Sequence, residues 1–156
     1  ITDNDLGLTV GTRRSVVVHN TVVDNDVGIR VGTLLPTNDV VGNDVVDNGQ
    51  PVTARSGPVH VWTVAGAGNY WGPVPGFDRD GDGAVDRAFR PADPVDVTAS
   101  RAAGGPTLAR SPALGLLEQV AASLPGLRDV GVIDTAPRME PTRPDRLTEV
   151  RNETDD

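Results

Sequence analysis

The strongest constraint on the fold is that the sequence repeats itself with a period of slightly more than twenty residues. Residues 1–12, ITDNDLGLTVGT, align with residues 22–33, VVDNDVGIRVGT, at an offset of 21. Residues 20–25, NTVVDN, align with residues 43–48, NDVVDN, at an offset of 23. Self-similarity at such a period is typical of a solenoid, in which each repeat packs against its neighbours in a stack.

The residue types within one repeat favour a β-helix over a leucine-rich repeat. Each repeat contains short valine-rich runs such as residues 15–18, SVVV, and β-branched side chains favour strands. Clusters of Asp, Asn and Gly separate these runs and favour turns, and no repeat has room for a helix. The sequence therefore predicts an all-β fold, a right-handed parallel β-helix with about three coils.

Several residues fall at equivalent places in successive repeats. Gly7 and Gly28 do so, which indicates a shared need for a tight bend or a positive φ angle. Asn20, Asn43 and Asn69 each lead a new coil, and we expect their side-chain amides to form an internal ladder of hydrogen bonds. Such stacked residues have a structural role.

The predicted stack of about three coils would expose strand edges and core at its upstream end. We therefore expect further coils to precede this part of the chain.

Charge and composition narrow the possible partners. The net charge is −8 at pH 7, and the 14 basic residues other than His are all arginines. An acidic surface repels phosphates, which argues against binding to nucleic acids or to anionic membranes.

An acidic, lysine-free chain fits a halophilic source, where salt screens carboxylates from one another, although a GC-rich genome would also deplete lysine. The absence of cysteine excludes disulfides and thiolate ligands, and no apolar run approaches the roughly 20 residues needed to span a bilayer.

The sharpest chemical pattern is an acidic loop that begins at Asp78. Carboxylates occupy positions 1, 3, 5 and 9 of this loop, Gly83 occupies position 6, and the carbonyl group of Ala84 would be the ligand at position 7. Alternate oxygen ligands around a glycine turn are typical of Ca²⁺ sites. The predicted calcium ligands are Asp78, Asp80, Asp82, Ala84 and Asp86.

The loop departs from an EF-hand at position 12, where Phe89 replaces the bidentate Glu. Asp93, Asp96 or water would have to complete the site. The alternative is an acidic surface turn, and in either case the role is structural.

Five segments together carry a family resemblance. Residues 68–72, GNYWG, are followed by the acidic loop and by residues 90–96, RPADPVD. Residues 111–117, SPALGLL, and residues 131–141, GVIDTAPRMEP, follow further downstream. This arrangement resembles the C-terminal part of the NosD family, periplasmic copper-processing proteins of the CASH-type right-handed β-helix class. Thr135 stands where that family usually has Ser, and Arg138 where it usually has Leu.

The resemblance implies that the Asn-Tyr-Trp motif closes the β-helix. Tyr70 and Trp71 would form an apolar plug over the open end of the core, because a stack of coils needs a cap. A metal-bound loop would hold Phe77 across that plug. The predicted structural cap is thus Asn69, Tyr70, Trp71 and Phe77, with carbohydrate stacking on the two neighbouring rings as the alternative role.

The resemblance also implies a function. NosD proteins work in denitrification with the permease and ATPase of an ABC transporter and with a copper chaperone, outside the cytoplasmic membrane. There they help to mature the copper centre of nitrous oxide reductase. The chain would be associated with the membrane through these partners, without a span of its own.

The sequence contains few residues that could bind copper. The candidate copper ligands are His19, His60 and Met139, since Cu(I) prefers thiolate, thioether and imidazole groups. The two histidines are 41 residues apart, close to two coils, so the repeat could place them on one face, and ordinary surface histidines are the alternative.

No pair of carboxylates is placed for acid and base catalysis, so the sequence predicts a protein that is not an enzyme. The alternative function is that of an extracellular surface-layer or carbohydrate-binding β-helix.

The chain divides into four regions. Residues 1–72 would form the coils and the aromatic cap, and residues 73–100 the acidic metal loop with its extension. Residues 101–141 would contain a short C-terminal α-helix and the family-type ending. The helix is expected over residues 111–124, with Ser111 as N-cap and Pro112 in its first turn, packing on its own domain or docking a partner. Residues 142–156 are expected to be a disordered acidic tail.

Overall fold

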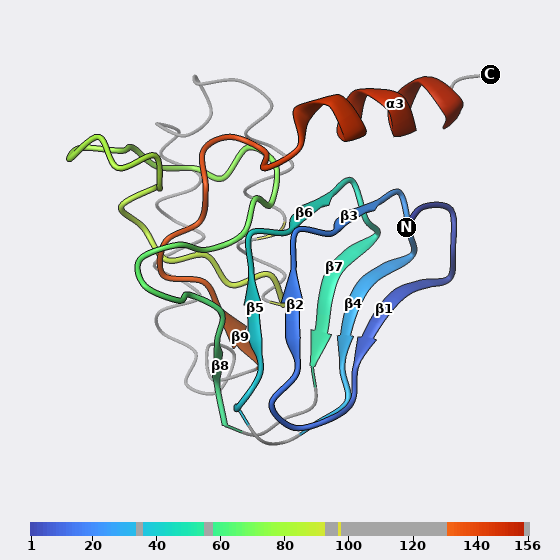
Figure 1. Ribbon diagram of the computed structural model, residues 1–156, viewed down its shortest axis with the longest axis horizontal. Helices are drawn as coiled ribbons and strands as arrows, with labels where there is room; N and C mark the ends of the chain where they lie inside the picture. Colours follow the sequence, from blue (N-terminus) through green and yellow to red (C-terminus); the bar gives the residue numbers. More distant parts are fainter. Residues whose placement is uncertain (34–35, 55–57, 93–96, 98–130, 155–156) are drawn as a thin grey trace.

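The computed structural model describes residues 1–33, 36–54, 58–92, 97 and 131–154 (Figure 1). The regular elements of these residues are strands, apart from one helix near the end of the chain, in agreement with the all-β prediction. The elements are β1 (Leu6–Val10), β2 (Val16–Val18), β3 (Thr21–Val23), β4 (Val27–Val31), β5 (Asp39–Val41), β6 (Asp44–Val46), β7 (Gln50–Ala54), β8 (His60–Val61), β9 (Val132–Ile133) and α3 (Pro144–Thr154).

The strands form short parallel ladders. Their orders are β1-β4-β7, β2-β5, β3-β6 and β8-β9. Leu6 pairs with Val27, and Val27 in turn pairs with Gln50. Residues that align in the sequence repeat therefore lie side by side, and each pass of the chain is placed against the one before it (Figure 1).

The core lies between the ladders. It is built from inward-facing β-branched side chains of successive strands, and the aromatic rings of the later residues extend it. Its buried members are Val10, Val22, Ile29, Val31, Val40, Val45, Val52, Trp62, Trp71, Phe89 and Val132. Outward residues alternate with them, as Arg30 does between Ile29 and Val31 on β4.

One corner of each pass uses an aspartate in the left-handed backbone region. Asp3, Asp24 and Asp47 have φ angles of 57°, 55° and 56°. Asp and Asn adopt this conformation more readily than other non-glycine residues. The Asp-Asn pairs of the repeat are thus the turns that the sequence predicts.

Gly7 and Gly28 are not glycines because of a positive φ angle, which was one of the two reasons that the repeat suggested. Neither has a positive φ angle. A Cβ atom on Gly7 would lie 2.8 Å from the carbonyl oxygen of Gly28, and one on Gly28 would lie 2.7 Å from that of Pro51. Glycine is needed here because neighbouring passes approach closely.

The predicted asparagine ladder is confirmed. Nδ2 of Asn20 donates to Oδ1 of Asn43 at 2.9 Å, and Nδ2 of Asn43 donates to Oδ1 of Asn69 at 2.9 Å. The backbone N–H groups of Asn20 and Asn43 donate to the same two oxygens. These bonds satisfy amides that would otherwise be buried without partners.

A second ladder, which the sequence analysis did not identify, runs along the Asp-Asn corners. Nδ2 of Asn4 donates to Oδ1 of Asn25 at 3.2 Å, and Nδ2 of Asn25 donates to Oδ1 of Asn48 at 2.9 Å. Each asparagine thus joins two neighbouring passes.

The C-terminal segment differs from the prediction of disorder over residues 142–156. Pro144–Thr154 forms α3, which packs beside β3 (Figure 1). Leu147 is buried with Val23 and Val46, and the backbone N–H groups of Thr142 and Arg143 donate to the buried carboxylate of Asp44. A single apolar anchor and this carboxylate hold a segment whose composition suggested disorder.

Two further expectations fall outside the described residues: the helix over residues 111–124, and the ligands Asp93 and Asp96. In the part of the chain that is described, no helix is both long and apolar enough to cross a membrane.

Candidate functional site

The predicted cap residues Asn69, Tyr70 and Trp71 do lie at the downstream end of the strand ladders. Tyr70 forms a parallel bridge with Asp44, and the backbone N–H of Val45 donates to its carbonyl oxygen at 2.8 Å. The side chain of Tyr70 packs against Val23, Val46 and Leu147. Residue 70 therefore continues the ladder that β3 and β6 begin.

Trp71 is buried in an aromatic stack. Its ring lies nearly parallel to that of Trp62, with centroids 6.2 Å apart and planes 11° apart. The ring of Phe89 is tilted by 44° against it at 5.8 Å. Because Trp71 is only 5% exposed, it fills the core and offers no face on which a sugar could stack.

A buried carboxylate, that of Asp134, organises the cap. It is fully buried, and its Oδ2 atom accepts hydrogen bonds from the backbone N–H of Asn69 at 2.7 Å and from Nε1 of Trp71 at 2.8 Å. Its Oδ1 atom accepts from the hydroxyl of Thr63 at 3.0 Å and from the backbone N–H of Ala136 at 3.1 Å. Asp134 thus ends the ladder of Asn20, Asn43 and Asn69, since Nδ2 of Asn69 also faces its Oδ2 at 3.3 Å.

Asp134 lies within the family-type ending, and the sequence alone indicated no role for it. The available signal was an acidic residue directly after the apolar pair of β9. A charged residue at the end of a buried strand needs partners, since an isolated buried charge is costly.

The segment that carries Asp134 lies between the cap and the acidic loop. Asp134 bridges to Phe89 and Arg138 bridges to Ala84, both in antiparallel fashion. The backbone N–H of Arg138 donates to the carbonyl oxygen of Asn69 at 2.9 Å, and that of Met139 donates to Gly83 at 3.0 Å. Residues 131–139 therefore tie the acidic loop to the end of the ladders.

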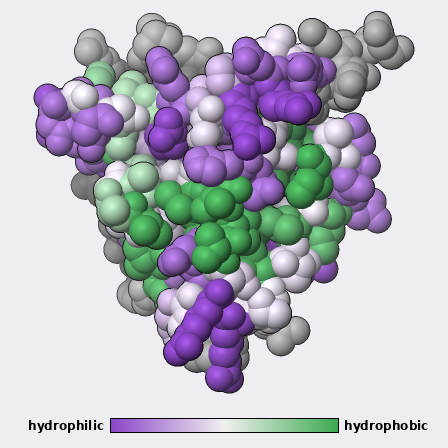
Figure 2. Space-filling model, viewed as in Figure 1, coloured by the Kyte–Doolittle hydropathy of each residue, from purple (hydrophilic) through white to green (hydrophobic). Residues whose placement is uncertain are grey.

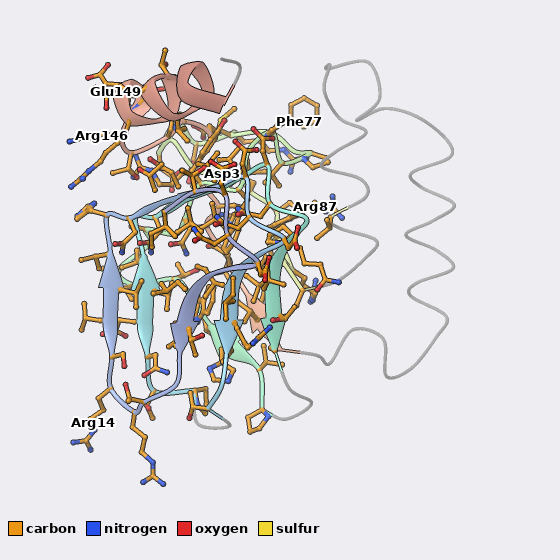
Figure 3. The ribbon with its side chains drawn as sticks, turned by 90° about the vertical axis from the view of Figure 1, so that its right-hand side faces the viewer. Asp3, Arg14, Phe77, Arg87, Arg146 and Glu149 are labelled. Atoms are coloured by element: carbon orange, nitrogen blue, oxygen red, sulfur yellow. The ribbon has the colours of Figure 1, made fainter. Side chains whose placement is uncertain are left out.

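Phe77 does not join the buried part of the cap. Its side chain is 55% exposed, and Figure 3 shows it at the outer surface, pointing away from the strands. Its backbone carbonyl oxygen accepts a hydrogen bond from the N–H of Asp86 at 2.9 Å, which closes the acidic loop. The rings that complete the cap are those of Trp62 and Phe89, both already in the core.

The acidic loop brings three of the predicted calcium ligands together. One carboxylate oxygen each from Asp78, Asp80 and Asp82 lies within 4.8 Å of the others. Gly81 and Gly83 have φ angles of 80° and 84°, the left-handed conformation that glycine adopts freely.

Backbone hydrogen bonds shape this cluster. The N–H groups of Gly83 and Gly81 donate to the carboxylate of Asp78 at 2.9 and 2.6 Å. These bonds favour the charged form and lower the pKa of Asp78 below its usual 3.8. Asp78 is therefore ionised at neutral pH, as a ligand to a hard cation must be.

The other two predicted ligands are placed differently. The Oδ2 atom of Asp86 accepts from the backbone N–H of Arg79 at 2.8 Å, and Asp86 is not part of the cluster. Ala84 is buried opposite Arg138. Oxygen donors of this kind suit Ca²⁺ or Mg²⁺ and do not suit Cu(I).

The candidate copper ligands are not brought together. His19 is exposed at one corner of its pass. Gly42 and Gly68 belong to the same corner in later passes, and the N–H of Gly42 donates to the carbonyl oxygen of Gly68 at 3.0 Å. His60 lies instead on β8, paired with Val132. Met139 is 48% exposed beside the acidic loop, so the three residues share no common site.

His60 is a buried imidazole. It is 4% exposed, and its Nδ1 atom has no hydrogen-bond partner among the described residues. Burial disfavours the charged ring and lowers the pKa of His60 below its usual 6.5, while a hydrogen bond to the backbone of Thr33 acts in the opposite direction.

Comparison with known proteins gives a consistent result. Residues 1–76 match the model of the family described as periplasmic copper-binding protein (NosD). A protein named probable ABC transporter binding protein NosD from Pseudomonas aeruginosa is 36% identical over 102 residues, which cover 65% of this chain and 24% of that protein. A protein of the same name from Stutzerimonas stutzeri is 34% identical over 117 residues, covering 75% of this chain and 27% of that protein.

The chain thus spans about a quarter of the length of these two relatives. Both matches extend over more residues than the family match does. They agree with the resemblance drawn from residues 68–141, and the chain is NosD-like.

Proposed function

We propose that this chain is a non-enzymatic accessory module that works with an ABC transporter in maturing the copper centre of nitrous oxide reductase, outside the cytoplasmic membrane. The observation that carries the proposal is the match to two relatives named as ABC transporter binding proteins, together with a family described as periplasmic and copper-binding. The remaining partners, a permease, an ATPase and a copper chaperone, follow from the family resemblance.

The fold supports a scaffold role. The parallel ladders, whose pairing follows the sequence repeat, are the arrangement expected of the coils of a right-handed β-helix. The polar groups at the centre of the cap, Asn69 and Asp134, are buried and engaged with one another. Groups committed to the core in this way support the structure and are not presented to a substrate.

In the proposed system copper is the cargo, which this chain would bind only transiently. Among the described residues, the candidate ligands His19, His60 and Met139 lie apart, and the one group of three or more potential ligand side chains is made of carboxylates. We infer that this module does not provide a complete Cu(I) site by itself. Any direct copper ligands of the mature system would lie on other residues or on partner proteins.

The acidic loop is proposed to hold a structural Ca²⁺ ion through Asp78, Asp80 and Asp82. Bound there, the ion would neutralise three neighbouring carboxylates and crosslink the loop. Because Met139 and Gly83 are joined by a backbone hydrogen bond, a rigid loop would also stabilise the segment that carries Asp134.

Co-purification from the native host tests the transporter role. A tagged form of the protein that contains this chain is isolated from membranes solubilised in high salt, and the associated proteins are identified by mass spectrometry. Recovery of a permease and its ATPase supports the proposal. Recovery of surface-layer protein alone, or of neither, contradicts it and favours the alternative of a surface-layer or carbohydrate-binding protein.

A further inference from the structure

Three peptide bonds of the chain join an Asp or Asn residue to a glycine. They are Asp80-Gly81 and Asp82-Gly83 in the acidic loop, and Asn48-Gly49 after β6. Because glycine has no side chain to shield its nitrogen, these are the bonds at which the main chain most readily attacks the preceding side chain.

The surroundings of the three bonds differ. Residues 80–83 are all exposed, and in Figures 1 and 2 the acidic loop projects from the upper left of the molecule with a hydrophilic surface. Asn48 is only 2% exposed, and the backbone N–H of Gly49 donates to the carbonyl oxygen of Asn25 at 2.7 Å, within the ladders. The two Asp-Gly bonds are therefore the ones open to a local rearrangement of the backbone.

In an Asp-Gly bond the glycine nitrogen can attack the Cγ atom of the preceding aspartic acid. A C–N bond forms, and the N–H proton leaves with the carboxyl OH as water, which closes a succinimide ring. Water then opens the ring, and opening at the main-chain carbonyl yields isoaspartate. No atom is gained or lost overall, but the main chain now runs through the former side chain and is longer by a methylene group.

A single carboxylate holds both attacking nitrogens. The backbone N–H of Gly81 donates to Oδ1 of Asp78 at 2.6 Å, and that of Gly83 donates to Oδ2 at 2.9 Å. An N–H must stay in line with its acceptor, so these bonds resist the rotation of the peptide plane that an attack requires. Hydrogen bonds to an ionised carboxylate are among the strong ones. One reacting side chain is held as well, because Oδ1 of Asp82 accepts from the N–H of Ala84 at 2.8 Å.

We propose that Asp80 and Asp82 are sites of isoaspartate formation in this chain, and that Asp78 protects them in the folded state by holding the two glycine nitrogens. This protection depends neither on a bound cation nor on the transporter role. Its consequence for metal binding does rest on the proposed Ca²⁺ site, because isoaspartate at either position would move a carboxylate out of the cluster.

The test follows isoaspartate in the purified chain, kept at physiological temperature and pH with a chelator present. Peptides that contain residues 78–86 are analysed by electron-transfer fragmentation, which distinguishes isoaspartate from aspartate. The chain in urea gives the rate without structure. The variants are Asp78→Ala and the matched control Asp86→Ala, since Asp86 also accepts from a backbone N–H of the loop, that of Arg79 at 2.8 Å.

Asn48 is an internal control for global unfolding. Its amide is lost through the same ring chemistry, and the loss changes the mass of its peptide. Because the N–H of Gly49 is bonded to the neighbouring pass, this reaction reports separation of the passes and not movement of the acidic loop.

We expect isoaspartate to form at residues 80 and 82 in urea, and about tenfold more slowly in the folded chain. Asp78→Ala should remove most of this difference while Asn48 keeps its amide, and Asp86→Ala should stay close to the unchanged chain. Equal rates in the two variants would overturn the proposal. So would a slower rate in Asp78→Ala, because Asp78 would then assist the reaction, or loss of the Asn48 amide in step with isoaspartate, because global unfolding would then be the cause.

Discussion

Replacing Asp134 by asparagine tests whether this carboxylate organises the cap. The substitution keeps the size of the side chain and changes one oxygen into an NH₂ group. If that group takes the Oδ1 side, the hydroxyl of Thr63 can reverse and accept, but the backbone N–H of Ala136 loses its acceptor. The opposite orientation is worse, because Asn69 and Trp71 both donate to Oδ2.

The expected cost follows from these bonds. A buried N–H without an acceptor costs about 1–3 kcal/mol, and the bonds that remain change from charge-assisted to neutral. We expect Asp134→Asn to lower the free energy of unfolding by about 2–4 kcal/mol in total. For a chain of this size that corresponds to a fall in Tm of about 5–15 °C.

The assay is urea and thermal unfolding followed by tryptophan fluorescence. Both tryptophans of the chain, Trp62 and Trp71, belong to the stack beside Asp134, so the signal reports on this site. Asp39→Asn is the matched control, because Asp39 is exposed on β5 and loses the same charge. Asp134→Asn unfolding within about 0.5 kcal/mol of the control would refute the role assigned to Asp134.

Three further predictions concern other parts of the structure. Asn43→Ala should destabilise the protein by about 2–4 kcal/mol and Asn20→Ala by less, since Asn43 is fully buried and hydrogen-bonded to both Asn20 and Asn69. Equal urea midpoints of the two variants would contradict the stabilising role of the asparagine ladder. Ca²⁺ should raise the Tm of the protein in a calorimetric scan, and a chelator should reverse this increase. The double variant Asp80→Asn, Asp82→Asn should show no increase. An equal increase in the double variant would exclude the acidic loop as the Ca²⁺ site. The pKa of His60 is lowered on folding, so below pH 6.5 the unfolded state binds more protons than the folded state, and stability should fall as the pH drops through that value. The variant His60→Gln should flatten this part of the pH profile of the urea midpoints. An unchanged slope would show that other groups cause the pH dependence.

The sequence could predict those contacts that follow from the period of its repeat. The offset between repeats places Leu6 against Val27 and Asn20 against Asn43, so strand pairing and the first asparagine ladder follow from alignment alone. The acidic loop is equally local, because alternation around Gly81 gathers Asp78, Asp80 and Asp82 within a few residues.

Contacts between distant, non-repeating segments could not be predicted in this way. Asp134 lies 65 residues from Asn69, and no periodicity connects the two. The environment of His60 could not be predicted for a related reason. The spacing of 41 residues allowed one face shared with His19, with surface histidines as the alternative, whereas His60 is buried on β8, which pairs with a strand from the end of the chain. The helix α3 was missed because a single buried leucine, Leu147, together with the carboxylate of Asp44, anchors it.

The proposed function is tested most directly by the copper content of nitrous oxide reductase. The reductase is purified from the native host, from a strain that lacks the protein containing this chain, and from that strain after complementation. We predict that the reductase from the deletion strain lacks copper at its catalytic centre, and that complementation restores it. Full copper loading in the deletion strain would contradict the account.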